Sequence, residues 1–291
     1  MNLTKIMKRV LMLIVAGLLT WIILSYAGAR YASHPNLVDL PEVSHFFDFP
    51  VEEITLQTSD NVQIAGWYIK GDSAKAVVLT NGIRGNRRGL VERAKLYEEA
   101  GFGVLLIDLR GTGESEAQAI SYGWHERHDI HAATDFLREK GYTGIGAHGI
   151  SLGAAATVYG LQEKPNYVFV ILESCYGSVR DALNNRLEMK YIPRFSTMFM
   201  RKFSEWHLGV TMQQLRPTDH IKSAQMPVLI IAGDSELRVK KSETEALHIN
   251  CGSSNKTLHY IKGAKHVNLL HHSPEAYRKI IAEFLSDLGD F

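Results

Sequence analysis

Short apolar runs alternate with amphipathic segments along most of the chain. The apolar runs have the length of buried strands, and the segments between them carry the spacing of helices that cover a sheet. The predicted strands are residues 51–57, 62–70, 76–80, 104–108, 144–148, 167–173, 227–232 and 257–261. The predicted helices are residues 91–100, 126–140, 152–161, 240–248 and 274–288. This alternation predicts an α/β fold with a mainly parallel sheet that has helices on both faces.

The N-terminal segment follows a different pattern. Three basic side chains precede an uncharged run over residues 10–29, which ends at Arg30. A helix of this length rises about 30 Å, enough to cross the hydrocarbon core of a bilayer. We therefore predict a signal anchor over residues 1–30, with the basic end in the cytoplasm and the remaining chain outside it. The alternative is a signal peptide cleaved at the small residues 27–29, which would leave a secreted or periplasmic protein.

The remaining chain divides into a linker and one domain. Residues 31–50 contain three prolines and are predicted to be a linker that settles onto the domain at 51–291. Residues 176–225 interrupt the strand and helix alternation and are rich in aromatic residues and methionine. A connection this long usually has its own structure and often acts as a lid. The alternative is that the segment packs on the body of the domain.

Composition and charge exclude some classes of protein. The chain has 291 residues, of which 45% are hydrophobic, and this is enough for one large core. The formal net charge is +1 with no basic stripe, so nucleic acid is not an expected partner. Cys175 and Cys251 form neither a disulfide framework nor a zinc site, although a single bridge between them stays open.

A candidate nucleophile lies within Gly149-Ile150-Ser151-Leu152-Gly153, between a predicted strand and a predicted helix. A serine at such a turn is held in strained backbone with its hydroxyl above the sheet. Glycine is needed on both sides because strand and helix pass closely there. The helix that follows points its free N–H groups and its positive dipole end toward the same place. The alternative is an ordinary glycine-rich turn.

Several further motifs occur in a fixed order around this turn. Residues 81–85 read Asn-Gly-Ile-Arg-Gly, residues 108–115 read Asp-Leu-Arg-Gly-Thr-Gly-Glu-Ser, residues 233–239 hold an acidic turn, and residues 263–266 end in histidine. With the serine turn, this order resembles the α/β-hydrolases, and most closely the membrane-anchored, Bem46-like serine hydrolases. The resemblance implies an eight-stranded α/β-hydrolase fold with a short helical lid insertion, and no cofactor or metal.

The resemblance also implies roles for individual residues. Ser151 is the expected nucleophile and His266 the general base, in the chain order of this fold. Glu236 is the expected acid, because it lies three residues after a glycine and three before a valine; Asp234 is the alternative. The backbone N–H groups of Ile83 and Leu152 are the expected oxyanion hole.

Several other side chains invite a second interpretation. Asn81 replaces the histidine usual in the oxyanion loop, and Arg84 is taken as a solvated charge, the alternative being that it faces the pocket and favours an anionic substrate. The histidines near the start of one helix recur every three residues and are taken as a solvated face rather than as metal ligands. The helix histidines just described are His125, His128 and His131. Elsewhere, His148 is expected to be a core histidine bonded to backbone, and Glu173 to make a structural hydrogen bond.

The function that these features predict is hydrolysis of acyl esters or thioesters through an acyl-enzyme on Ser151. A small-molecule or lipid-like acyl substrate suits a lid of this composition beside a membrane. We expect lid side chains such as Phe199 and Phe203 to contact the long acyl chain of such a substrate. A peptidase or amidase with the same triad, and a non-catalytic binding protein on the same fold, remain alternatives.

Overall fold

A computed structural model describes residues 3–163, 167–266 and 268–289, so the first two residues of the predicted anchor lie outside it. An eight-stranded sheet has the strand order β10-β9-β8-β7-β4-β5-β3-β2. Neighbouring strands from β10 to β5 run parallel, whereas β3 is antiparallel to both β5 and β2. The strands are β2 Glu52–Gln57, β3 Gln63–Ile69, β4 Lys75–Thr80, β5 Gly103–Ile107, β7 Gly144–Ile150, β8 Val170–Glu173, β9 Val228–Gly233 and β10 Lys256–Ile261. The predicted mainly parallel sheet is confirmed.

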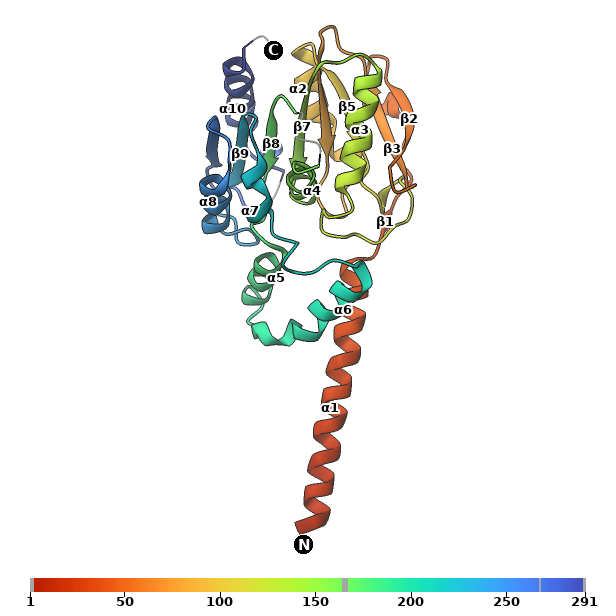
Figure 1. Cartoon of the computed structure of the whole chain (residues 1–291), viewed down its shortest axis with the longest axis vertical. Coiled ribbons are helices and arrows are strands. Elements are labelled where there is room, and N and C mark those ends of the chain that lie inside the picture. The colour runs from red at the N-terminus through yellow and green to blue at the C-terminus, as the bar shows by residue number, and fades with distance from the viewer. Residues whose placement is uncertain (1–2, 164–166, 267, 290–291) are drawn as a thin grey trace.

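Helices cover both faces of this sheet (Figure 1). One face packs against α3, α4 and α8, and the other against α2, α9 and α10. The strands supply both cores because successive side chains point to opposite faces, as Val77 and Val78 do. The covering helices are α2 Val91–Glu99, α3 Arg127–Glu139, α4 Leu152–Gly160, α8 Lys241–Asn250, α9 Leu269–His272 and α10 Pro274–Asp287.

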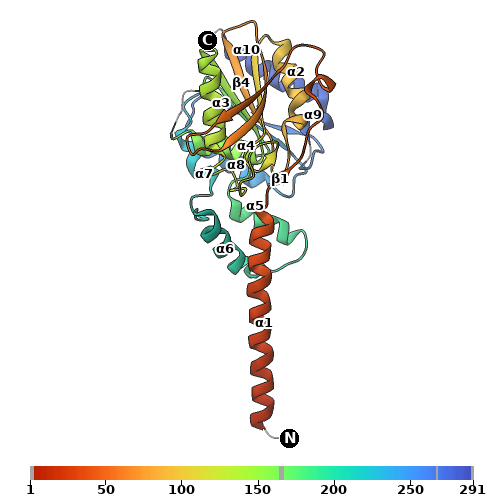
Figure 2. The same ribbon diagram turned by 90° about the vertical axis from the view of Figure 1, so that its right-hand side faces the viewer.

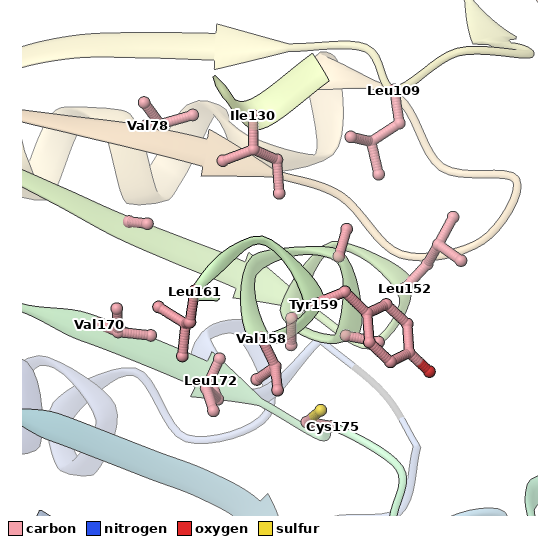
Figure 3. Packing of buried hydrophobic residues seen from close by; sticks show 14 of the residues in the cluster. Val78, Leu109, Ile130, Leu152, Val158, Tyr159, Leu161, Val170, Leu172 and Cys175 are labelled. Atoms are coloured by element: carbon pink, nitrogen blue, oxygen red, sulfur yellow. The ribbon is translucent and has the colours of Figure 1, made fainter. Parts of the chain in front are cut away.

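The helix α4, which follows the serine turn, lies within the core of the domain. Each of its residues is buried, and small side chains let it approach the sheet closely. Figure 3 shows Val158 and Leu161 beside Val170 and Leu172 of β8, within one apolar cluster. The serine turn is therefore anchored at both ends by the core.

The predicted lid segment contains α5 Val179–Glu188, α6 Met198–Leu208 and α7 Pro217–His220, together with short 3-10 turns at Arg194–Thr197 and Ile221–Ser223. Of these helices, α5 and α6 lie outside the sheet domain (Figure 1), whereas α7 packs against α4 and α8 within it. Figures 1 and 2 show α5 and α6 between the sheet domain and the long N-terminal helix α1, Leu3–Ala32, which projects away from the body. The C-terminal part of α1 packs against α6.

The segment after α1 runs along the body of the domain. It contains the two-residue strand β1, Asn36–Leu37, which pairs in parallel with β6, Thr112–Gly113, and a 3-10 turn at Val43–His45. Phe47 is buried against Trp67. Cys175 and Cys251 are both buried as free thiols, so no bridge joins them.

Candidate active site

The serine turn has the backbone strain expected of a nucleophile elbow. Ser151 follows β7 directly and has φ 51° and ψ −100°, in a region that L-residues rarely occupy. A Cβ on Gly149 would lie 2.4 Å from the Ala154 nitrogen, and one on Gly153 would lie 2.4 Å from Thr80 Oγ1. Both positions therefore require glycine. The Ser151 N–H donates to the Glu173 carbonyl at 2.8 Å, which ties the turn to β8.

The predicted oxyanion loop lies directly against the elbow. A Cβ on Gly82 would be 3.5 Å from Ser151 Cβ, and the Gly153 N–H donates to the Asn81 carbonyl at 3.0 Å. Within the described residues, the buried Asn81 side-chain amide has no hydrogen-bond partner. Its backbone, rather than its side chain, therefore holds the loop to the elbow. Ile83 and Leu152 line the same pocket as Ser151.

Of the two candidate acids, only Glu236 contacts His266. Glu236 Oε2 lies 2.7 Å from His266 Nδ1, and Glu236 Oε1 accepts the N–H groups of Arg238 at 2.7 Å and Val239 at 3.3 Å. Asp234 Oδ1 instead accepts the Gly263 N–H at 2.7 Å. Asp234 therefore links the acidic turn to the backbone of the histidine loop.

The surroundings of Glu236 keep it ionised. Burial by itself would raise the pKa of this carboxyl, but the hydrogen bond and charge of His266 and the two backbone N–H groups outweigh burial and hold the pKa below its ordinary value. A carboxylate at this position accepts a hydrogen bond from the N–H at His266 Nδ1. The tautomer that results leaves Nε2 as the basic nitrogen of the ring.

A cavity of about 680 Å³ opens beside Ser151. Its walls come from the elbow, the oxyanion loop, the lid helices α5 and α6, and the end of α1 at Tyr31 and Ala32. Arg84, expected to be solvated, also lines this cavity: its guanidinium donates to the Tyr31 carbonyl at 2.8 Å and lies 4.6 Å from the centre of the Tyr31 ring. The size is that of a site for a small organic ligand.

The expectation that Phe199 and Phe203 contact the substrate is wrong. Phe199 packs edge-on against Trp21 of α1, with ring centroids 4.8 Å apart, and Phe203 packs against Tyr26 at 5.5 Å. The side of α6 that faces the cavity carries Met200, Arg201 and Ser204 instead. A helix presents different side chains to two neighbours, and the sequence could not show that α1 is one of them.

A buried ionic network lies beneath the elbow, and sequence reasoning missed most of it. His148 was expected to bond backbone, but its Nε2 lies 2.7 Å from Glu173 Oε1 and its Nδ1 lies 3.0 Å from the Tyr97 hydroxyl. Arg93 of α2 makes a two-pronged contact with Glu173, with Nε–Oε1 at 2.6 Å and Nη2–Oε2 at 2.7 Å. Arg93 Nη2 also donates to Asn268 Oδ1 at 3.1 Å.

This network joins the serine turn to the histidine loop. Glu173 holds the Ser151 N–H through its carbonyl and Arg93 through its carboxylate, and Arg93 reaches Asn268, two residues after His266. Burial would raise the pKa of Glu173, but the Arg93 charge and the bonds from His148 and Arg93 outweigh it and hold that pKa well below its ordinary value. Besides the expected structural roles of Glu173 and His148, the sequence signal for this network was a charged arginine on the apolar face of a predicted helix.

Replacing Arg93 with methionine should lower the free energy of unfolding by about 3–5 kcal/mol, because Glu173 would be left buried without its counter-ion. Chemical denaturation in detergent measures the change. Lys95→Met on the same helix is the matched control: Lys95 pairs with Glu92 at 3.6 Å on the surface, and an exposed pair contributes at most about 1 kcal/mol. Equal effects of the two variants would contradict the role given to Arg93.

The three helix histidines do not form one group. His125 Nε2 contacts the Leu208 carbonyl at 3.1 Å and His131 Nε2 the Gly160 carbonyl at 3.1 Å. Possible ligand atoms of His128, His131 and Glu163 lie within 4.8 Å of one another, but Glu163 Oε1 is bound by Arg127 at 2.8 Å. The absence of a metal remains a prediction.

Comparison with known families decides the classification. Residues 90–288 match the Prolyl oligopeptidase family. The chain belongs to this family. As a member of the prolyl oligopeptidase family with the α/β-hydrolase fold, it is a hydrolase by class, and the resemblance found in the sequence is confirmed.

Relatives of this family member come from bacteria and yeasts, and one of them is named as a membrane protein. It is 26% identical over 237 residues to the uncharacterized protein YqkD of Bacillus subtilis, covering 77% of each chain. It is 26% identical to the uncharacterized membrane protein YNL320W of Saccharomyces cerevisiae, covering 90% of this chain and 86% of the relative. The protein bem46 of Schizosaccharomyces pombe is 22% identical, with 83% and 78% covered.

Solved structures share the fold of this family member. The Pyrococcus furiosus esterase Pf2001 superposes with a TM-score of 0.72 at 24% identity, covering 88% of this chain and 100% of the esterase. A membrane phospholipase A described as a bacterial virulence factor superposes with a TM-score of 0.62 at 15% identity, covering 100% of both chains. At these identities the likeness extends to the fold alone.

Proposed function

We propose that this protein is a serine hydrolase of acyl esters or thioesters, with Ser151, His266 and Glu236 as its catalytic triad. The contact between Glu236 and His266, on the same edge of the sheet as the strained Ser151 turn, carries the proposal. His266 Nε2 takes the Ser151 proton as Oγ attacks the acyl carbonyl, and then gives it to the leaving alcohol or thiol. Water activated by the same nitrogen releases the acid.

The backbone around Ser151 supports stabilisation of the tetrahedral intermediate. The N–H of Leu152 begins α4, where helix N–H groups are free of intrahelical partners. The loop of Ile83 lies against Ser151, as the Gly82 and Asn81 contacts show. We assign the two N–H groups to the oxyanion, a contribution worth about 3–4 kcal/mol for one donor in a comparable enzyme.

We propose that α1 is a retained anchor. Its described residues 3–32 form one helix long and apolar enough to cross a membrane. The part before Trp21 rises about 27 Å, close to the thickness of a bilayer core. The remainder carries the aromatic contacts to α6, and Trp21 Nε1 donates to the Ser196 carbonyl at 2.8 Å. Cleavage at the small residues 27–29 would remove these contacts.

A membrane position would place the lid and the cavity mouth at the lipid surface. Large apolar side chains on the lid are exposed, including Phe195 and Trp206, the latter 74% exposed. Aromatic residues gather at the interface between water and lipid. A lipid-like acyl ester could then enter the cavity from the bilayer, beside the end of α1 that lines it.

Full-length protein should sediment with membranes after a high-salt wash, whereas a variant that lacks residues 1–20 should lose this attachment and keep esterase activity. The truncation retains Trp21 and Tyr26, so the lid contacts stay in place. Protease added outside sealed right-side-out vesicles should digest the catalytic domain of the full-length protein. A protected domain would reverse the proposed orientation, and a mature N-terminus at Arg30 would show cleavage.

A peptidase or amidase with the same triad is the second candidate, because the family that matches is named for peptidases. A fluorophosphonate probe detects an activated serine in either case. Paired substrates then separate the two: a p-nitrophenyl ester and a p-nitroanilide with the same acyl group. Turnover of the ester alone supports the proposal, rapid turnover of the anilide supports the amidase, and no labelling supports a non-catalytic protein.

A further inference from the structure

The cavity beside Ser151 has a one-sided charge. Five cationic side chains line it, and none of its described lining residues carries a carboxylate. The whole chain has a formal net charge of only +1, so this excess is local. The cations come from the oxyanion loop, from both lid helices and the turn between them, and from the loop after Glu236. They are Arg84, Arg186, Lys190, Arg201 and Arg238.

Arg186 on α5 lacks a neutralising partner among the described residues. It is half-buried, and its Nη1 donates to the Ala182 carbonyl at 2.7 Å. Burial lowers the pKa of Arg186, and the nearby charge of Arg238 lowers it further. Glu236 and Glu243 attract Arg186, but the oxygens of Glu236 are already held by His266 and backbone N–H groups. Those of Glu243 are held by the Asn185 amide and by backbone N–H groups.

The buried arginines elsewhere in the described chain contrast with Arg186. Arg87, Arg93 and Arg110 each form an ion pair with a carboxylate. A cation partly withdrawn from water without such a partner is costly. The charges of Arg186 and Arg238, which line one cavity, also repel each other. An anion bound between Arg186 and Arg238 would remove both costs.

We propose that the natural substrate is an anionic acyl ester, with a phosphate-like group held by Arg186 and Arg238 and its acyl chain among apolar side chains such as Leu183 and Met200. Guanidinium groups suit phosphate oxygens because they donate paired hydrogen bonds. This inference rests on the proposed ester hydrolysis and names its substrate class. A membrane lipid and a soluble phosphate ester share this chemistry.

The test compares two esters that differ in charge: 1-lauroylglycerol 3-phosphate and 1-lauroylglycerol, with full-length protein in neutral detergent micelles. We expect kcat/KM to be at least about tenfold higher for the phosphate ester, since a charged hydrogen bond is commonly worth this much or more. The ratio should fall as salt is added. Arg186→Gln and Arg238→Gln should each reduce the ratio about tenfold.

Arg278→Gln is the matched control. Arg278 lies on α10, away from the cavity, and pairs with Glu99 at 3.6 Å on the surface. This variant should leave the ratio unchanged. A third ester, 1-butyrylglycerol 3-phosphate, separates the sources: faster turnover of the lauroyl ester indicates a lipid, and faster turnover of the butyryl ester indicates a soluble substrate.

Equal kcat/KM values for the charged and neutral lauroyl esters would overturn the inference and leave ester hydrolysis standing. An unchanged ratio in both arginine variants, with weaker binding to anionic vesicles, would also overturn it and assign the cations to the membrane surface. If no ester is hydrolysed, the proposed function fails, and the inference about the anionic group is then tested by ligand binding instead. Dodecyl phosphate should then bind Ser151→Ala in calorimetry, and bind at least about tenfold more weakly when Arg186→Gln is added; no binding overturns the inference.

Discussion

Replacing Ser151 with alanine should lower kcat for ester hydrolysis by about a million-fold, the effect of removing the nucleophile from a comparable triad. The same variant should lose fluorophosphonate labelling. Without the hydroxyl no acyl-enzyme can form, and the histidine and oxyanion donors have no covalent intermediate to act on. Steady-state rates on a p-nitrophenyl ester and gel detection of the probe measure both effects.

The fold of the alanine variant should stay intact. Alanine keeps the Cβ of Ser151 and meets the same backbone strain at φ 51°, so the turn loses no packing atom except the hydroxyl oxygen. The free energy of unfolding should change by less than about 1 kcal/mol. A purified variant with a native melting temperature and most of its activity would show that another residue is the nucleophile.

Replacing Glu236 with glutamine should lower kcat by about ten-thousand-fold, as loss of the orienting carboxylate does in another triad. The glutamine amide would keep the shape of the side chain, and its oxygen would stay with the backbone N–H groups of Arg238 and Val239. Its NH2 group would then face His266 Nδ1 and, as a donor that cannot accept a hydrogen bond, would favour the wrong tautomer of the ring. The negative charge that stabilises the imidazolium would also be lost. Rates on the same ester measure the change.

Asp234→Asn is the matched control for this prediction. The amide oxygen of asparagine can still accept the Gly263 N–H that Asp234 Oδ1 accepts at 2.7 Å, so the histidine loop keeps its attachment. We expect a loss of tenfold or less, through positioning alone. The reverse order of the two effects would move the triad acid to Asp234 and leave the rest of the mechanism in place.

The sequence by itself determined the architecture of this protein. Buried strands and covering helices have local signatures, so the parallel sheet was predictable from apolar runs alone. The serine turn was also predictable from local sequence. Strand and helix pass too closely there to leave room for side chains, so residues 149 and 153 must be glycine. The long apolar N-terminal helix likewise follows from composition along a single segment.

Only the tertiary structure decided which side chains meet. Asp234 and Glu236 are two residues apart, and the sequence does not show which of them contacts the histidine. In the structure, Asp234 accepts a backbone N–H of the histidine loop that follows β10, whereas Glu236 contacts His266 itself. Phe203 faces α1 rather than the cavity because the C-terminal part of α1 packs against α6. The pairing of Arg93 with Glu173 joins residues 80 positions apart. Contacts between distant segments leave no periodic trace in the sequence, so they follow from packing alone.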